Sequence, residues 1–286
     1  MKLIPVMKLA AVAALATFCS FNANAQGGYV KLGAAYNFGN GGDIEYNTTS
    51  TYVGTNNGGS RTEKYERVNV NLGKGISAGG TLGYMFNQHV GAELGIAYLL
   101  GGKNEITSTH TETNPNFNRN SSTKTETYSR MLLLQPSVII SAGMEGLNPY
   151  ARFGLVAANG KVYLNNEQTG SDGEFIYESE YSGNWGLGLQ GGLGIDFGLS
   201  ENLGFFTEVT MSNLKYSPDK MEIVTLTHNG IDRLGALSTN EKEYEFLDEF
   251  EATYPGNSSD SEPSKEHKFN MPFGSVGVGI GIKYNF

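Results

Sequence analysis

The last residues of the chain, 276–286, alternate strictly between apolar positions and small or polar positions. An apolar side chain stands at every second place from Val276 to Phe286, and glycine, lysine or asparagine stands between them. Because successive side chains of a strand point to opposite faces, this segment is predicted to be a strand with one apolar face. The other face is too small and glycine-rich for the outside of a soluble protein. The pattern therefore predicts an all-β transmembrane barrel whose apolar face meets lipid.

The same alternation recurs along the chain and predicts eight antiparallel strands in up-and-down order. Their expected ranges are 29–38, 75–86, 90–100, 128–141, 149–158, 184–199, 203–214 and 268–286. The fourth is the least regular, because Leu133 and Ile139 interrupt its polar face. The sixth is the clearest, with Leu187, Leu189 and Ile195 among its apolar positions.

Short and long connections alternate between these strands. The short ones are 87–89, 142–148 and 200–202, and the long ones are about 39–73, 102–127, 159–183 and 215–267. A barrel of the outer membrane has short periplasmic turns and long extracellular loops, whereas a soluble sandwich has no reason for this asymmetry. The rhythm therefore predicts both chain ends on the periplasmic side.

Parts of the long connections carry strand signals of their own. Residues 105–111 and 121–127 flank a turn-forming Asn-Pro-Asn run, and 221–228 alternates before Asn229 and Gly230, a strong hairpin signal. These segments predict either hairpins that continue the sheet beyond the membrane or a ten-stranded barrel. The residues after Gly230 lack an apolar stripe for lipid, which favours eight strands.

The first 25 residues have the features of a cleaved signal peptide. Lys2 and Lys8 precede a short apolar run, and Ala23-Asn24-Ala25 fits a small-residue cleavage site. A lipoprotein site at Cys19 is the alternative, but Phe18 is bulky where such sites need a small residue. We expect a barrel domain over residues 26–286, without cysteine after cleavage.

Charge and hydropathy exclude several classes of protein. The whole chain has a net charge of −9, and loss of Lys2 and Lys8 changes this to −11. Nucleic-acid binding needs a basic surface, so we expect no nucleic-acid partner. Apart from the signal peptide, no apolar run approaches the length of a membrane helix.

The chain resembles the small eight-stranded outer-membrane barrels, the OmpA/OmpX/OmpW-like group of porin-family proteins in Gram-negative cell envelopes. The resemblance rests on the signal peptide, the alternating strands, the loop rhythm and a final strand that ends at Phe286. It implies that Ile280, Ile282, Tyr284 and Phe286 form the C-terminal signal read by the barrel-insertion machinery. No peptidoglycan-binding domain is expected after the last strand.

The predicted inward positions include six charged residues. These are Lys31, Glu93, Arg152, Asp196, Glu208 and Lys283, accompanied by Gln135 and Gln190. An eight-stranded barrel is just wide enough for its side chains to fill it, and buried charges are costly unless they pair. We expect a structural network of ion pairs, in which Arg152 is a partner of Glu93 or Glu208. The alternative is a polar path for small solutes.

Candidates for catalysis and metal binding are weak. His89, His110, His228 and His267 are scattered through turns and loops, and the nearest group to a catalytic set is Ser264, Glu266 and His267. No zinc or calcium spacing is present, and we expect no catalytic residues, metal or cofactor. The acidic run 241–251 is expected to be a solvated loop, with a weak calcium site or a docking surface for a basic partner as alternatives.

The expected function is non-enzymatic, namely surface interaction or envelope structure through the extracellular loops. A narrow porin-like channel is the alternative, and a lipid-modifying enzyme is less favoured. Expected partners are outer-membrane lipid, the insertion machinery during assembly, and an extracellular protein or surface that binds the loops.

Overall fold

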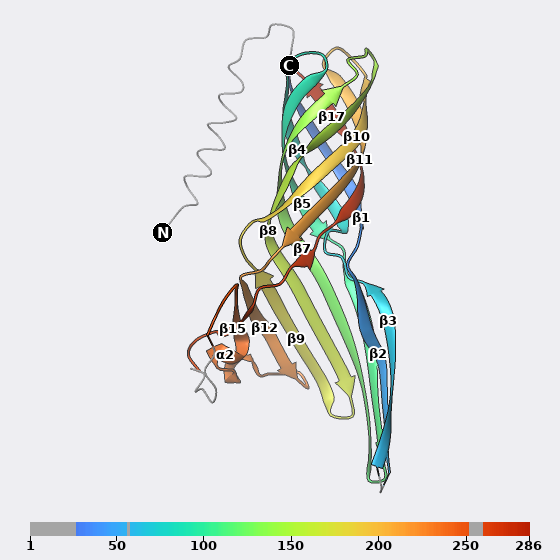
Figure 1. Cartoon of the computed structure of the whole chain (residues 1–286), viewed down its shortest axis with the longest axis vertical. Coiled ribbons are helices and arrows are strands. Elements are labelled where there is room, and N and C mark those ends of the chain that lie inside the picture. The colour runs from blue at the N-terminus through green and yellow to red at the C-terminus, as the bar shows by residue number, and fades with distance from the viewer. Residues whose placement is uncertain (1–26, 56–57, 252–259) are drawn as a thin grey trace.

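The computed structural model describes residues 27–55, 58–251 and 260–286. The proposed signal peptide, residues 1–25, lies outside the described residues. The described chain forms seventeen strands in a single sheet, with only two short helical segments, η1 (Leu234–Ala236) and α2 (Thr239–Lys242). No helix in the described residues is long and apolar enough to cross a membrane. A closed barrel forms one end of the molecule, and an open sheet extends from the other end (Figure 1).

The barrel is a ring of antiparallel pairings in the order β1–β4–β5–β7–β8–β10–β11–β17 and back to β1. The strands that form it are β1 (Gly28–Gly39), β4 (Gly75–Met85), β5 (Val90–Gly101), β7 (Phe117–Ser141), β8 (Leu147–Gly170), β10 (Gly186–Gly198), β11 (Leu203–Tyr216) and β17 (Ser275–Asn285). Pairing of the first and last strands, from Tyr29 with Asn285 to Gly39 with Ser275, closes the ring. Closure leaves no unpaired edge inside this part of the sheet.

The alternation in sequence sorts the side chains between the two faces of the barrel wall. Leu187, Leu193 and Ile280 on the outer face are 68%, 69% and 68% exposed. Lys31 and Glu93 on the inner face are 4% and 5% exposed. The wall is therefore apolar outside and polar inside, as in a barrel that has lipid for its outer solvent.

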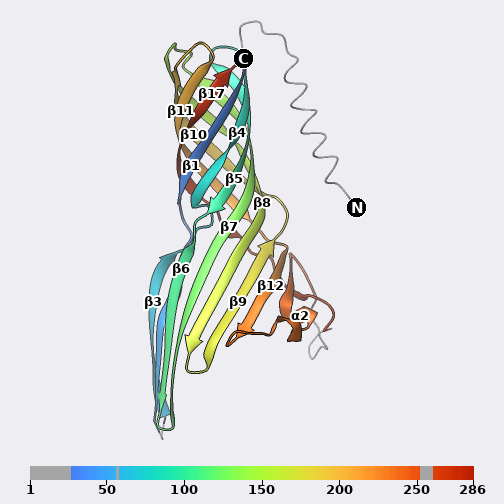
Figure 2. The same ribbon diagram turned by 180° about the vertical axis from the view of Figure 1, so that it is seen from behind.

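Strands β7 and β8 are about twice as long as their barrel neighbours and carry the sheet beyond the ring. On one side the order continues through β6 (Asn104–Asn114), β2 (Asp43–Thr55) and β3 (Gly58–Asn69). On the other side it continues through β9 (Gly173–Ser182), β12 (Lys220–His228), β14 (Glu243–Leu247) and β15 (Ser264–His267). We call these strands, with the outer halves of β7 and β8, the outer sheet (Figure 2).

The two edges of the outer sheet differ. Beside β12, the segment with η1, α2 and β14 packs on an apolar cluster that contains Met221, Ile223 and Phe246. The two-residue strand β13 (Ile231–Asp232) also pairs with β12. By contrast, β3 pairs only with β2 among the described strands, and its residues are exposed almost throughout. The β3 edge of the outer sheet is therefore open.

The outer sheet accounts for most differences from the expected strands. The expected segments 105–111 and 121–127 do form a hairpin, and His228 pairs with Ile231 around the Asn229-Gly230 turn. The expected strands 128–141 and 149–158 are much shorter than β7 and β8. The polar residues that continue both strands outside the ring remain paired with one another. The last strand begins at Ser275 rather than Lys268, since the residues before it include the short strand β16 (Met271–Pro272) at the barrel mouth.

Replacement of Leu189 by arginine tests the outward face of the wall. Leu189 is 52% exposed on β10, and we expect Leu189→Arg to lower the free energy of unfolding in lipid vesicles by about 2–4 kcal/mol, the cost of a cation near the bilayer midplane. Urea titration in vesicles measures this change. Thr62→Arg on β3 is the control and should leave unfolding nearly unchanged. An unaltered Leu189→Arg midpoint would place Leu189 away from hydrocarbon.

Candidate functional site in the barrel lumen

The six charged residues predicted to face inward lie together in the lumen as three ion pairs. The Lys31 ammonium lies 3.0 Å from Glu93 Oε1, and the Lys283 ammonium lies 2.7 Å from Asp196 Oδ2. The Arg152 guanidinium meets Glu208 through Nε, 2.9 Å from each carboxylate oxygen, and through Nη2 at 2.8 Å. Of the two partners expected for Arg152, it therefore pairs directly with Glu208.

Two of the three pairs are coupled to one another. The Lys31 ammonium is also 4.0 Å from Asp196 Oδ1, which connects the pair on β1 and β5 with the pair on β10 and β17. Three cations in the lumen are thus matched by three carboxylates, and their formal charges cancel. Neutral pairing of this kind offsets part of the cost of removing charges from water.

Aromatic rings enclose the ion pairs. The Tyr29 hydroxyl donates to Glu93 Oε1 at 2.7 Å, and the Lys283 ammonium lies 4.4 Å from the centre of the Tyr29 ring. The Lys31 ammonium lies 4.1 Å from the ring centre of Tyr150 and 5.3 Å from that of Phe206, close enough for cation–π attraction. The sequence interpretation overlooked all three rings, although the strand alternation already places them on the inward face.

Glycines opposite these rings provide the space that they occupy. A Cβ atom on Gly83 would lie 2.1 Å from Tyr29 Cζ, and one on Gly194 would lie 2.4 Å from Tyr150 Cζ. Real Cβ atoms do not approach ring carbons this closely. The high glycine content of the inner face therefore gives the rings room to pack beside the charges.

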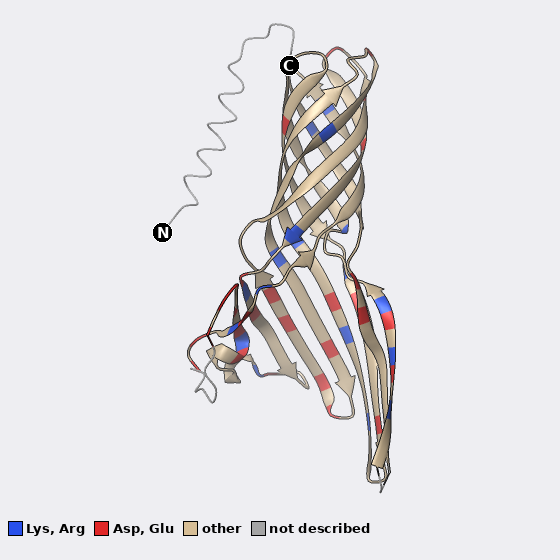
Figure 3. Ribbon diagram, in the orientation of Figure 1, with Lys and Arg blue, Asp and Glu red and all other residues tan. Residues whose placement is uncertain are grey.

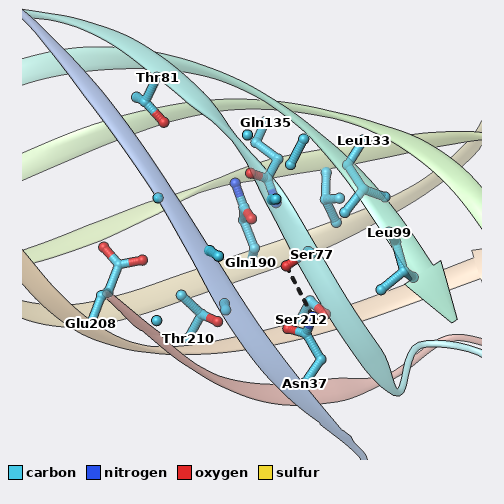
Figure 4. A pocket seen from close by; sticks show the side chains of 18 of the residues that line it. Asn37, Ser77, Thr81, Leu99, Leu133, Gln135, Gln190, Glu208, Thr210 and Ser212 are labelled. Carbon is cyan, nitrogen blue, oxygen red and sulfur yellow. Dashed lines mark hydrogen bonds between the residues drawn. The ribbon is translucent and has the colours of Figure 1, made fainter. Parts of the chain in front are cut away.

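A polar cavity of about 140 Å³ lies next to the ion pairs, toward the outer sheet. Its lining includes Asn37, Ser77, Gln135, Gln190 and Ser212 (Figure 4). Asn37 Nδ2 donates to Ser77 Oγ at 3.0 Å, but Gln190 Nε2 is buried and has no hydrogen-bond partner among the described residues. Lys31, Glu93, Arg152 and Glu208 also line the cavity, which thus offers both charged and uncharged hydrogen-bonding groups to a small polar molecule.

An apolar cluster closes the barrel mouth between this cavity and the outer sheet; we call it the plug. Its buried members are Leu72, Leu99, Met131, Val156, Ala158, Val162, Leu214, Tyr216, Met271 and Phe273. Leu133, which interrupts the polar pattern of its strand, lines the cavity and packs against the plug. The other interruption, Ile139, is 1% exposed on the same inner face.

Hydrogen bonds hold the plug segments in place. Asn71 Nδ2 donates to the carbonyl of Gly274 at 2.8 Å, and Asn104 Nδ2 donates to the carbonyl of Asn71 at 3.0 Å. Ser129 Oγ donates to the carbonyl of Leu72 at 2.7 Å. The sequence interpretation did not find the plug, because Leu72 and Phe273 come from connections far apart in the chain.

The histidines do not gather into a site. His89 lies in a turn beside Ser141, whereas His110, His228 and His267 lie on different strands of the outer sheet. Ser264 and Glu266 share one face of β15 and His267 lies on the other, and Ser264 Oγ donates to the carbonyl of Asn240 at 2.6 Å. No group of three potential metal ligands occurs in the described residues.

The acidic run 241–251 is more ordered than the expected loop. Glu241 accepts from the backbone N–H of Ser238 at 2.8 Å in a capping box of α2, and this bond lowers the pKa of Glu241. Residues 243–247 form β14, with Phe246 in the apolar cluster beside β12. The run therefore covers one edge of the outer sheet, and docking of a basic partner there stays a prediction.

The C-terminal residues named as an assembly signal lie on the outward face. Ile280, Ile282 and Tyr284 are exposed on β17, and the Tyr284 and Phe286 rings pack edge to face with centres 5.5 Å apart. Their reading by the insertion machinery stays a prediction.

Comparison with protein families agrees with this architecture. The outer membrane protein beta-barrel domain family matches residues 9–233, which is more than half of the chain. Comparison with curated proteins gave no significant match. Among solved structures, the chain is similar to the outer membrane protein OprG from Pseudomonas aeruginosa, with 13% identity, a TM-score of 0.41, and coverage of 91% of this chain and 96% of OprG.

CarO2 from Acinetobacter baumannii is a second similar structure, with 15% identity, a TM-score of 0.31, and coverage of 90% of this chain and 99% of CarO2. Likenesses this distant carry no information on ligand or activity. The family match and the ring of apolar-faced strands agree on location and fold. The chain belongs to the outer membrane protein beta-barrel domain family and is an outer-membrane protein.

Proposed function

We propose that this protein crosses the outer membrane with the eight strands of its ring and acts at the cell surface, without catalysis, through its outer sheet. In this orientation the short turns lie in the periplasm and the outer sheet stands outside the cell. The outward apolar side chains of the ring, such as Leu187, Leu193 and Ile280, form what we call the apolar belt. This belt and the concentration of polar residues in the outer sheet support the assignment.

Dense packing of side chains in the lumen is the observation that carries the proposal. The ion pairs and their rings fill one level, and the plug fills the mouth. Plug residues such as Leu99, Val156 and Phe273 line the cavity between them. This packing disfavours passage of solutes through the barrel. The outer sheet is therefore the part of the molecule that we expect to carry the function.

The open β3 edge is the best candidate contact within the outer sheet. A free edge presents backbone N–H and C=O groups that an extended segment of another protein could pair with. Charges of both signs alternate along it at Arg61, Glu63, Lys64 and Glu66. Charged edge residues discourage indiscriminate strand pairing, so the partner would need a complementary charge pattern.

A narrow channel is the second candidate. The polar cavity supports it, because Gln190 Nε2 has no protein partner among the described residues and could bind a passing solute. This function requires both the plug and the ion pairs to move. The other proposed partners are outer-membrane lipid around the belt and the insertion machinery at the exposed C-terminal residues.

Conductance separates the two candidates. We expect the purified protein in a planar lipid bilayer to give no stable single-channel steps, because two packed levels obstruct the lumen. Leu72→Ala combined with Phe273→Ala thins only the plug and should give no stable steps either, since the ion pairs remain. Stable conductance of the unmodified protein would favour the channel.

Removal of Arg152 tests whether the ion pairs stabilise the barrel. Arg152→Ala leaves the Glu208 carboxylate buried without its cation, and we expect a loss of about 3–5 kcal/mol of unfolding free energy. Thermal unfolding in detergent measures the loss. The double variant Arg152→Ala/Glu208→Ala removes both charges and should recover part of it. If Arg152→Ala melts like the unmodified protein, the pairs do not hold the barrel together.

Removal of the β2–β3 hairpin tests the surface role. Replacement of residues 43–69 by a short glycine-serine turn should leave the barrel folded, because these strands lie outside the ring. Adhesion of bacteria that display the protein, to one another and to surfaces coated with extracellular-matrix proteins, should fall to background.

The matched control keeps the hairpin but neutralises its charges with Arg61→Gln and Glu63→Gln. If backbone pairing provides the contact and the charges select the partner, this variant loses part of the adhesion, whereas hairpin removal abolishes it. Undiminished adhesion after hairpin removal would exclude the β3 edge as the contact.

A further inference from the structure

Basic residues gather where the apolar belt of the barrel ends and the outer sheet begins. They are Lys74, Lys103, Arg130, Lys161 and Lys215, contributed by or next to β4, β5, β7, β8 and β11. Figure 3 shows blue segments at the junction of barrel and sheet. The turns at the opposite end, 86–89, 142–146 and 199–202, contain neither lysine nor arginine. Positive charge thus marks only one of the two rims.

Arg130 and Lys161 face each other directly across this rim. They form a cross-strand pair of β7 and β8, and the alternation of both strands places them on the outward face. Next to them on that face, toward the belt, stand Leu132 and Asn159. Like charges directly opposite one another destabilise a sheet. Glu180 pairs with Lys161 on one side, and an anion bound between Arg130 and Lys161 would attract both cations.

The Arg130 guanidinium is held in place but has no carboxylate partner. Its Nη1 donates to the carbonyls of Gly101 at 3.0 Å and Ser129 at 2.9 Å, and its Cζ lies 5.0 Å from the ring centre of Tyr128. Among the described residues it forms no ion pair, and its Nε and Nη2 make no hydrogen bond. Arginine binds phosphate through such paired N–H groups.

The acidic neighbours lie on the far side of this pair, away from the belt. Lys161 is bonded to Glu180, a residue opposite Tyr163 and further from the barrel. Lys103 and Lys124 share Glu126, which lies further along β7 than Arg130. The outward positions of β7 and β8 between the pair and the belt carry no carboxylate. The side of the pair that faces the membrane is therefore positive.

We propose that Arg130 and Lys161, flanked by Lys103, bind a phosphate group of a lipid headgroup in the outer leaflet. The proposal rests on the orientation given under Proposed function. Headgroups begin where the hydrocarbon belt ends, and basic residues at that depth attract anionic lipids. The stacked rings of Tyr128 and Tyr163, with centres 5.0 Å apart, border the pair on its outer side, as aromatic residues do at membrane interfaces.

Energy transfer from the single tryptophan tests the proposal. Trp185 is the only tryptophan of the chain and adjoins β10, the strand next to β8. The protein would be reconstituted in phosphatidylcholine nanodiscs that contain a minority of dansyl-labelled bisphosphoryl lipid A, or the same fraction of dansyl-labelled phosphatidylcholine. We expect clearly greater transfer to lipid A than to the neutral lipid.

Charge-neutral variants show whether the pair is responsible. Arg130→Gln/Lys161→Gln should reduce transfer to lipid A to the level of the neutral lipid, and Arg130→Lys should keep part of the excess. The control Arg61→Gln/Lys64→Gln removes the same charge from β3 and should leave transfer unchanged. Heat-modifiable migration in gels verifies that each variant is folded. Retained excess in the first variant, or equal transfer to both lipids, would overturn the proposal.

Two further measurements separate the sources of failure. Inorganic phosphate added to the buffer should not abolish the excess, since only the lipid is concentrated at the rim; full displacement would indicate a site for free phosphate and would overturn the lipid assignment. Protease cleavage of the hairpin 43–69 on intact cells tests the orientation separately. If the hairpin is cleaved but energy transfer to lipid A does not exceed transfer to the neutral lipid, the lipid site is wrong and the orientation stands. If the hairpin is protected from cleavage, the proposed orientation is wrong.

Discussion

Closure of the backbone ladder between the first and last barrel strands is the constraint on which the other features depend. In a bilayer an unpaired N–H or C=O group costs several kcal/mol, and the register from Tyr29 with Asn285 to Gly39 with Ser275 leaves none at the seam. Once the ring is closed, each residue lies either inside or outside. The alternation along each strand then decides whether a side chain packs against other side chains in the lumen or contacts lipid outside the ring.

The lumen follows from this division. A ring of this size leaves little interior space, so every large inward side chain needs a small one opposite. Gly83 and Gly194 fill that role for Tyr29 and Tyr150. Charges that are enclosed in this way must pair, and the three cations do so with three carboxylates. Toward the mouth the inward residues become apolar and pack as the plug, without any need for pairing.

Alternation made the barrel strands and the inward charges predictable, but only within limits. The expected strand 184–199 has nearly the same bounds as β10, because its alternation with a period of two is unbroken. Which charges would meet was not predictable, because the partner of Arg152 depends on the stagger of strands far apart in sequence. The parallel pairing of β2 with β6, and the plug contact between Leu72 and Phe273, likewise join distant segments and leave no local signal.

The same division of faces continues beyond the membrane and explains the position of the basic rim. Because β7 and β8 run through the ring and the outer sheet without a break, the outward face that carries Leu132 and Leu155 inside the bilayer carries Arg130 and Lys161 on the side of the outer sheet. Their cross-strand register makes the two cations direct neighbours. Like charges placed opposite one another weaken a sheet, even though Glu180 offsets part of the charge of Lys161. At the surface of an anionic leaflet the pair becomes a place where a headgroup can lower the energy of both.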